Sequence, residues 1–352
     1  MKIVHLTYAM SFGGIETMLV NIANEQVQSD YIYIVSINDK YEASLLHALD
    51  KRVKFINVGR PVGSKNPWYI LKLNLVLKKI SPDIIHVHHP SIIRFLLPKF
   101  LNKSMIVFTM HDIPVKEDLN YLYKYKTVYA ISQSVQISLS KSGIASEVIT
   151  NGILPDKFGK RNISNKHSIF RMVQIGRLYH EKKGQDFMIE VCAYLYKHGY
   201  RKFHLDFIGD GGSLEYLQDK VKSSQLEDNI TFVGAKEQSY IYANLKKYDL
   251  FLQPSRREGF GLTVAEAMAA KVPVLVSEQE GPLEIIDNGK YGFFFPVDNV
   301  KACAEKILQI SSLQDLNPLL DLALKRVEDN YNVKNTAKDY LESYRDLLVD
   351  LS

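Results

Sequence analysis

The sequence predicts an α/β protein with two doubly wound parallel sheets. Short apolar runs rich in Val, Ile and Phe alternate with segments of helical periodicity along almost the whole chain. Strands inside a parallel sheet are buried on both faces, which explains why these runs have few polar interruptions. The chain has 352 residues, 46% of them hydrophobic, which is enough for two domains with a core each.

The first half of the chain begins with a strand, a loop containing paired glycines and a helix. Five further apolar runs then alternate with helical patterns up to Asn151. The polar stretch 155–167 lacks periodicity and is expected to be a linker. The expected strands are 2–8, 31–36, 53–58, 83–87, 105–109 and 127–131, and the expected helices include 15–27, 67–79 and 91–101.

The second half repeats this alternation and ends in a helical tail. From Leu313 to Leu351 the sequence has helical character and no strand signal. The expected strands are 169–175, 203–208, 230–233, 250–252, 274–276 and 292–295, and the expected helices are 185–198, 214–223, 238–246, 262–270 and 300–310.

Composition excludes several classes of protein. The two cysteines, Cys192 and Cys303, lack metal-type spacing, which fits a reducing compartment and argues against a structural zinc site. No apolar run is as long as a transmembrane helix, and the first strand lacks the long apolar stretch of a signal peptide. The net charge of +5 is uneven, because residues 51–104 contain 11 Lys and Arg but only one acidic residue, Asp83.

The most specific motif lies between Gln253 and Glu284. A strand ends there, a charged loop with Glu258 follows, and a glycine-containing turn leads into a helix that contains Glu266. Ligands bind at such carboxyl edges of parallel sheets, and the free amides of a helix start favour anions. The glycines let the backbone approach a phosphate closely. The two carboxylates near this anion site are suited to binding sugar hydroxyls.

The run EGFGLTVAEAMA, which begins at Glu258, resembles the E-x7-E signature of retaining glycosyltransferases of family 4, which have the GT-B fold. The match includes Pro254-Ser255 and Pro273-Val274, whereas Lys271 replaces the usual glycine at a helix cap. The resemblance implies that Glu258 lies by the donor sugar and that Glu266 accepts hydrogen bonds from the ribose. It also implies that the turn Gly259, Phe260, Gly261 and Leu262 binds the donor.

Other elements of the family pattern supply cations and further donor contacts. Gly176-Arg177-Leu178, followed by Lys183-Gly184, resembles its G-R-L and K-G elements, with a spacing that leaves Lys182 or Lys183 as the lysine. We favour Lys183, because the residues after it align best. Arg177 and this lysine would stabilise charge on a departing diphosphate. The remaining matches are Gly13 and Gly14 with Glu16 near the diphosphate, and Gly209 and Val233 near the base and ribose.

Histidines gather at the ends of two expected strands. In family 4 a His-Asp step at the position of His111 lies near the reaction centre, so His111 is either catalytic or a structural histidine. His86, His88 and His89 suggest a metal, but no carboxylate pattern accompanies them, which favours acceptor lining or packing. No D-x-D motif occurs, so we expect neither a metal nor a cofactor, with Arg177 and Lys183 supplying the charge.

The resemblance implies two Rossmann-like domains that face each other across a cleft, and a last helix that crosses back to the first domain. We expect an acceptor-side domain at 1–154, a linker at 155–168, a donor-binding domain at 169–334 and the returning helix at 335–352. The implied reaction transfers a sugar with retention from a UDP- or GDP-linked donor to a saccharide or lipid-linked acceptor, in cell-surface polysaccharide or glycolipid assembly.

Two alternatives and a location follow from the same residues. A nucleotide-sugar 2-epimerase shares the GT-B fold and would act without an acceptor. A non-catalytic partner of a glycosylation complex would not bind the donor. The basic segment 51–104 predicts a cytoplasmic enzyme that docks on an anionic membrane surface. Nucleic acid is not expected, because no stacking motif accompanies the charge.

Overall fold

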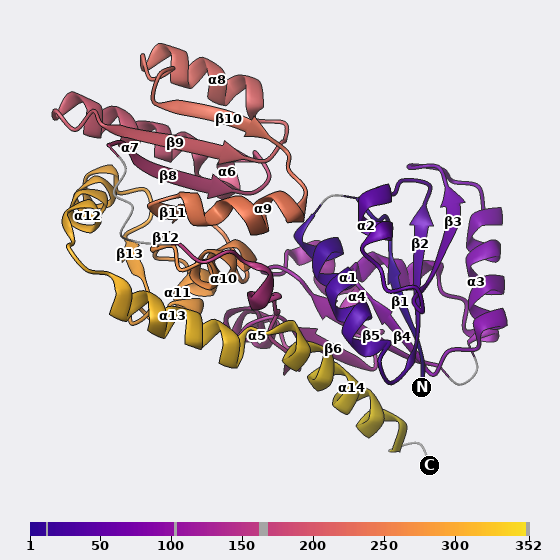
Figure 1. Ribbon diagram of the computed structural model, residues 1–352. Coiled ribbons are helices and arrows are strands. Elements are labelled where there is room, and N and C mark those ends of the chain that lie inside the picture. Colours follow the sequence, from indigo (N-terminus) through magenta and orange to yellow (C-terminus); the bar gives the residue numbers. More distant parts are fainter. Residues whose placement is uncertain (12, 102–103, 162–167, 350–352) are drawn as a thin grey trace. The chain divides into compact units, whose positions relative to one another are not determined.

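The computed structural model describes residues 1–11, 13–101, 104–161 and 168–349, which form two compact units (Figure 1). The first unit contains residues 1–153 and the C-terminal segment from Asn332, and the second contains Leu154–Tyr331. Residues 162–167 of the predicted linker and 350–352 of the predicted last helix lie outside the described residues.

The first unit is built on a seven-stranded parallel sheet with the order β3-β2-β1-β4-β5-β6-β7. The order reverses between β1 and β4, as in a doubly wound fold. The strands are β1 (Lys2–Thr7), β2 (Tyr31–Asn38), β3 (Lys54–Arg60), β4 (Ile84–Val87), β5 (Met105–Met110), β6 (Thr127–Ala130) and β7 (Glu147–Val148).

Helices cover this sheet, and one of them differs from the sequence-based expectation. The predicted helix 91–101 was wrong, because the structure has two 3-10 segments there, η1 (Pro90–Phe95) and η2 (Pro98–Phe100). Proline at position 98 disfavours a helical conformation of Leu97, whose backbone is extended and interrupts the helix. The other helices are α1 (Gly14–Gln26), α2 (Ala43–His47), α3 (Trp68–Ile80), α4 (Lys116–Leu122) and α5 (Gln133–Lys141).

The C-terminal helix α14 (Val333–Val349) belongs to the first unit and packs against α1 (Figure 1). The amide of Val333 donates to the Ile153 carbonyl at 2.8 Å, and the Thr336 hydroxyl donates to the Thr150 carbonyl at 2.8 Å. A side chain at Gly152 would collide with the Val333 backbone, so glycine permits this close approach. The predicted return of the last helix is confirmed.

The second unit is built on a six-stranded parallel sheet with the order β10-β9-β8-β11-β12-β13. Its strands are β8 (Phe170–Ile175), β9 (Phe203–Ile208), β10 (Ile230–Gly234), β11 (Leu250–Gln253), β12 (Val274–Ser277) and β13 (Phe293–Phe295). Its helices are α6 (His180–Lys183), α7 (Gln185–Lys197), α8 (Leu214–Ser223), α9 (Gln238–Asn244), α10 (Leu262–Ala269), α11 (Glu280–Ile285), α12 (Val300–Ser312) and α13 (Asn317–Asn330), with 3-10 turns η3 (Pro155–Lys157) and η4 (Leu245–Lys247).

The core of the second unit forms between the sheet and helices α7 and α12. Phe187 stacks on Phe295 with ring centroids 5.5 Å apart, and both are buried. Cys192 and Cys303 lie in the same core, where burial raises the pKa of both thiols and keeps them unreactive. Among the described residues, no helix combines the length and apolarity that crossing a membrane requires.

Candidate active site

The predicted site residues of the second unit lie near the point where the strand order of the second sheet reverses. Strands β8 and β11 are neighbours there, and a different connection follows the carboxyl end of each strand. The connection after β8 carries Arg177 in a loop and Lys183 at the end of the short helix α6, and the loop after β11 carries Glu258. Ligands of doubly wound sheets bind in the crevice at this switch point.

Two opposite charges meet at this switch point. Lys183 Nζ forms an ion pair with Glu258 Oε2, and Gln253 Nε2 donates to the same oxygen at 2.9 Å. Both charged side chains remain partly exposed, at 22% for Lys183 and 14% for Glu258. The structure therefore brings together a lysine and a carboxylate that are 75 positions apart in the sequence.

Arg177 supplies a second cation in the loop that follows β8. Its side chain is exposed, and its guanidinium has no ion-pair partner within the described part of the chain. Arg256, by contrast, is fully engaged, because it pairs with Asp186 and Asp298 and donates to the His180 carbonyl. Arg177 is available to a ligand, whereas Arg256 connects the loop after β11 to the segment that follows β8.

Backbone contacts fix the position of the segment that carries Lys182 and Lys183, which we call the lysine loop. Gly184 has a φ of +68°, and a side chain there would collide with the Pro254 carbonyl. The Arg256 amide donates to the Lys182 carbonyl at 2.8 Å, and Gln174 Nε2 donates to the Lys183 carbonyl at 2.8 Å. Lys182 and Lys183 are therefore held at different places, and Lys183 forms the ion pair with Glu258.

A third loop, which follows β9, packs on the loop that carries Arg177. A side chain at Gly209 would collide with the Gly176 carbonyl, and the Leu178 amide donates to the Asp210 carbonyl at 3.0 Å. Val233 lies half-buried near the end of the adjacent strand β10. Gly209 and Val233, which were predicted to line the base and ribose site, thus lie at the same carboxyl edge as Arg177.

Helix α10 begins directly beyond Glu258. Its N-cap, Gly261, has a φ of +107°, which favours glycine, and the first amides of the helix have no partner inside it. Phe260 is buried and packs edge-on against Tyr331 at 5.6 Å. Of this predicted turn, Phe260 can therefore offer a ligand only its backbone.

Glu266 lies on α10 and is buried. Burial raises the pKa of its carboxyl to about 7, and a hydrogen bond from Gln238 Nε2 at 2.8 Å opposes this rise. A carboxyl with this pKa exchanges its proton near neutral pH, so the charge of Glu266 responds to whatever binds beside it.

The first unit carries the other predicted residues. A side chain at Gly13 would meet the Glu16 carboxylate, which therefore lies over the start of α1 beside Gly14. His111 follows β5, and its Nε2 lies 3.0 Å from Nδ1 of His88. Burial lowers the pKa of His111 to about 3, so its imidazole is neutral at physiological pH.

The histidines near β4 do not form an available metal site. His5, His86 and His88 lie close enough to share an ion, but all six of their ring nitrogens already lie within hydrogen-bond distance of a partner. Burial lowers the pKa of His86 and His88 well below the ordinary value. These rings are packed inside the unit as neutral hydrogen-bonding groups, and His89 is only partly exposed beside them.

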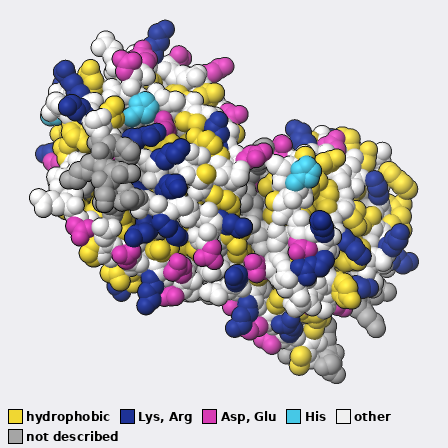
Figure 2. All heavy atoms as spheres, in the orientation of Figure 1, with side chains coloured by type: hydrophobic (Ala, Val, Ile, Leu, Met, Phe, Trp, Pro, Cys, Tyr) yellow, Lys and Arg dark blue, Asp and Glu magenta, His cyan; other side chains and the backbone are white. Residues whose placement is uncertain are grey.

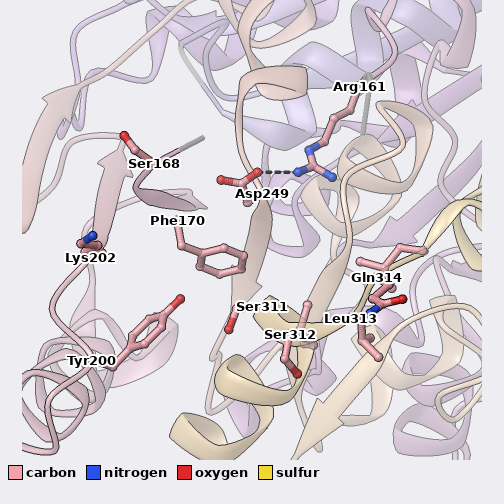
Figure 3. A pocket seen from close by; sticks show the side chains of 12 residues that line it. Arg161, Ser168, Phe170, Tyr200, Lys202, Asp249, Ser311, Ser312, Leu313 and Gln314 are labelled. Carbon is pink, nitrogen blue, oxygen red and sulfur yellow. Dashed lines mark hydrogen bonds and ion pairs between the residues drawn. The ribbon is translucent and has the colours of Figure 1, made fainter. Parts of the chain in front are cut away.

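A separate pocket of about 290 Å³ lies at the opposite edge of the second sheet (Figure 3). Phe170 and Asp249 line it near the amino ends of β8 and β11, and Arg161 points toward Asp249 and pairs with it. None of the predicted site residues lines this pocket. This pocket is therefore distinct from the carboxyl edge where Arg177, Lys183 and Glu258 lie.

Comparison with known proteins agrees with this geometry. The family model described as "Glycosyl transferases group 1" matches residues 156–323, and that described as "Glycosyltransferase Family 4" matches residues 12–157. The chain belongs to glycosyltransferase family 4. The family and the enzyme class predicted from the sequence are thereby confirmed.

Two curated relatives support the same assignment. The chain is 32% identical over 212 residues to the amylovoran biosynthesis glycosyltransferase AmsK of Erwinia amylovora, covering 57% of this chain and 52% of that protein. It is 28% identical over 249 residues to the putative colanic acid biosynthesis glycosyltransferase WcaL of Escherichia coli K12, covering 65% and 61%. The chain thus spans between half and two thirds of the length of these curated relatives.

A solved structure extends the likeness to the whole chain. Anabaena Alr3699/HepE, in complex with UDP and glucose, superposes with a TM-score of 0.83 at 20% identity, covering 97% of this chain and 99% of that one. This likeness, together with the two parallel sheets and the returning helix, confirms the GT-B fold of this family 4 member.

Sequence reasoning missed several residues that shape both units. Gln174 and Gln253 hold the lysine loop and the Glu258 carboxylate, and Gln26 and His5 belong to a buried network that ends at His111. A polar residue at the end of an apolar strand was the available signal for the two strand glutamines, because such a side chain lies at the carboxyl edge.

Proposed function

We propose that this family 4 glycosyltransferase moves a sugar from a UDP- or GDP-linked donor to an acceptor hydroxyl, with retention at the anomeric carbon. The observation that carries the proposal is the ion pair of Lys183 with Glu258 at the sheet switch point. Arg177, which precedes Lys183 in the same connection, is exposed and has no ion-pair partner among the residues that the structure describes. Two cations and the first amides of α10 form a site for a diphosphate, and Glu258 adds a carboxylate for sugar hydroxyls.

In the proposed reaction, the bond between the anomeric carbon and the diphosphate oxygen breaks, and the acceptor oxygen bonds to the same face of the sugar. The acceptor proton passes to the departing phosphate, so no protein base is required. Arg177 and Lys183 stabilise the charge that grows on the diphosphate. Glu266 accepts hydrogen bonds from the ribose, which favours its ionised form.

A uridine donor is our first choice, because the similar Anabaena structure contains UDP. We assign donor binding to residues 169–334 and acceptor binding to residues 1–154. The names of the relatives AmsK and WcaL refer to amylovoran and colanic acid biosynthesis, which supports a saccharide acceptor in cell-surface polysaccharide assembly.

A transfer assay tests this function. The protein is incubated with a panel of UDP- and GDP-sugars and oligosaccharide or lipid-linked acceptors, and the product is examined by NMR. We expect a new glycosidic bond with the anomeric configuration of the donor. A product of inverted configuration, or an epimerised donor formed without acceptor, would contradict the proposal.

We also propose a cytoplasmic enzyme that docks on an anionic membrane surface through α3. Three apolar side chains on one stripe of this helix are exposed, namely Trp68 at 55%, Leu71 at 37% and Leu75 at 44%. Apolar residues of a helix that lies on a sheet are expected to cover the sheet, whereas these three face outward. Lys78 and Lys79 are exposed in the last turn of the same helix. An amphipathic helix with this composition binds membrane interfaces.

Charge alone does not mark the docking surface. On the face drawn in Figure 2, Lys and Arg side chains are spread over both units, with Asp and Glu between them. Of the basic residues in α3, Lys72 is occupied, because its Nζ donates to the Val58 carbonyl at 2.6 Å. Lys78 and Lys79 are therefore the residues to test, together with the apolar stripe.

Vesicle binding tests the docking surface. Trp68 is the single tryptophan of the chain, so its fluorescence should shift to the blue on binding to anionic vesicles but not to neutral ones. Salt should reduce the binding, and Lys78→Glu with Lys79→Glu should weaken it by about 1 kcal/mol or more per residue. The matched control is Lys222→Glu with Lys325→Glu, two exposed lysines of the second unit. Equal binding to neutral vesicles, or none to either, would contradict the proposal.

A further inference from the structure

Polar residues share one face of the first sheet, although they come from three strands. His5 of β1 pairs in register with His86 of β4, and Thr109 of β5 follows on the same face. Alternate residues of a strand point to the same side. His88 therefore continues the row of His86 beyond the end of β4, and His111 continues the row of Thr109 beyond the end of β5. Gln26 of α1 and Tyr340 and Tyr344 of α14 cover this face with polar atoms that contact it.

Three histidines of this face form a continuous hydrogen-bonded chain. His5 Nε2 lies 2.7 Å from Gln26 Oε1, and His5 Nδ1 lies 3.1 Å from His88 Nε2. His88 Nδ1 lies 3.0 Å from His111 Nε2. The chain ends at His111 Nδ1, which is buried and has no hydrogen-bond partner among the described residues. We call Gln26, His5, His88 and His111 the histidine relay.

Burial keeps every ring of the relay neutral. It lowers the pKa of His5 to about 4 and that of His111 to about 3, and it lowers the pKa of His88 well below the ordinary value. A neutral imidazole has one N–H donor and one acceptor nitrogen. In a chain of such rings, the proton position on one ring therefore determines the proton position on the next.

The amide of Gln26 determines the direction of the relay. Its carbonyl oxygen can only accept, so His5 carries its proton on Nε2 and accepts on Nδ1. His88 must then donate from Nε2 and accept on Nδ1, and His111 must donate from Nε2. His111 Nδ1 is left with a lone pair and no proton.

We propose that Gln26, His5 and His88 are positioning residues that hold His111 in the Nε2–H tautomer and so present Nδ1 as a neutral acceptor to a substrate hydroxyl. The unpartnered Nδ1 atom at the end of the relay is the observation that points to a ligand. Such a weakly basic nitrogen orients a hydroxyl but does not remove its proton, which agrees with a reaction that needs no protein base. The identity of the hydroxyl as a sugar group rests on the proposed function.

The tautomer can be measured without any substrate. In protein labelled with ¹⁵N-histidine, the side-chain spectrum distinguishes a protonated from a bare ring nitrogen, and the signals lost in His111→Ala identify this residue. We expect His111 to be protonated on Nε2 and bare on Nδ1. A proton on Nδ1 in the wild-type protein would overturn the proposal.

Gln26→Glu should reverse the relay. A carboxyl buried beside His5 brings a proton, because an unpaired carboxylate is unfavourable there. Whether this proton rests on the carboxyl or on His5, the His5 Nδ1 atom then carries hydrogen. On His88 and His111 the proton therefore moves from Nε2 to Nδ1. His111 should become protonated on Nδ1 and lose its acceptor. Gln26→Leu, which imposes neither direction, should give a mixture of the two tautomers and serves if the first variant does not fold.

Gln28→Glu is the matched control, because Gln28 is exposed two residues further along. It should leave the His111 tautomer and turnover unchanged, whereas Gln26→Glu should lower turnover roughly threefold to tenfold, as expected for one neutral hydrogen bond. An unchanged His111 tautomer in folded Gln26→Glu would refute the relay. If the tautomer reverses but no sugar transfer occurs even in the wild type, the proposed function fails and the relay stands.

Discussion

The two units have the same strand order around their switch points but carry different polar residues there. In the second unit the reversal between β8 and β11 carries Arg177, Lys183 and Glu258, which are charged and in contact with solvent. In the first unit the reversal between β1 and β4 carries His5 and His86, which are buried and neutral. One fold thus supports two kinds of polar site.

The difference follows from the free energy of burying charge. A charge keeps its solvation at a partly exposed edge, where an anionic ligand can also bind it, whereas a buried group stays neutral unless it is paired. The first unit therefore uses imidazoles and phenols, and burial raises the pKa of Tyr340 and Tyr344 so that they remain protonated. We infer that the second unit acts through charge and the first through hydrogen-bond direction.

Glu258→Gln should produce the largest loss of activity. The substitution keeps the size of the side chain but removes the charge that pairs with Lys183 and that is proposed to face the donor sugar. Transfer should fall by roughly a thousandfold, while the melting temperature stays within a few degrees. Near-normal turnover would show that Glu258 is not part of the site. It would also contradict the inference that the second unit acts through charge.

Arg177→Ala and Lys183→Ala should each lower turnover about a hundredfold, because each removes one cation from the departing diphosphate. Lys182→Ala is the matched control for Lys183→Ala, since it removes the neighbouring lysine and keeps the Lys183–Glu258 pair. Chelation by EDTA should change the rate little. An absolute requirement for a divalent ion would show that the cations do not replace a metal.

Glu266→Gln should change the pH dependence of stability. Because the folded carboxyl has a pKa of about 7 rather than 4.5, the folded state binds the proton more tightly, and stability falls as pH rises through this window. The variant should therefore be about 3 kcal/mol more stable than the wild type at pH 8 and similar at pH 4.5. Urea unfolding at both values tests this, and equal stability at pH 8 would contradict the burial argument.

Tyr344→Phe should affect stability and leave transfer almost unchanged. Its hydroxyl lies 2.6 Å from His86 Nδ1, and its loss leaves that buried nitrogen without this partner, at a cost of about 1–3 kcal/mol. Tyr31→Phe, at a side chain that is 70% exposed, is the control. A large loss of turnover at full stability would assign His86 to the reaction and break the distinction between the two units.

Most of the fold could be predicted because strand signals in parallel sheets are local. Uninterrupted runs such as Val274–Val276 identify buried strands without knowledge of their neighbours. The segment 91–101 was missed, because helical periodicity was given more weight than Pro98. The outward position of Trp68 could not be derived either, because α3 has apolar residues on two sides and only packing decides which side is covered.

The candidate site was predictable where a motif is contiguous, as from Glu258 to Glu266. It was not predictable where contacts join distant residues, as between Lys183 and Glu258 or between His5 and His88, which are 83 positions apart. The alternation of polar residues at 86 and 88, and at 109 and 111, did carry a signal, since both rows had to face one side of the sheet.

Nucleotide binding measured in the absence of metal tests the central claim most directly. Melting temperatures are recorded with UDP and with GDP in EDTA, for the wild type, Lys183→Ala and the control Lys182→Ala. We predict that one nucleotide raises the melting temperature of the wild type and of the control, and that Lys183→Ala loses most of this increase. Stabilisation that survives in Lys183→Ala, or that appears only with a divalent ion, would contradict a charged diphosphate site at the switch point of the second sheet.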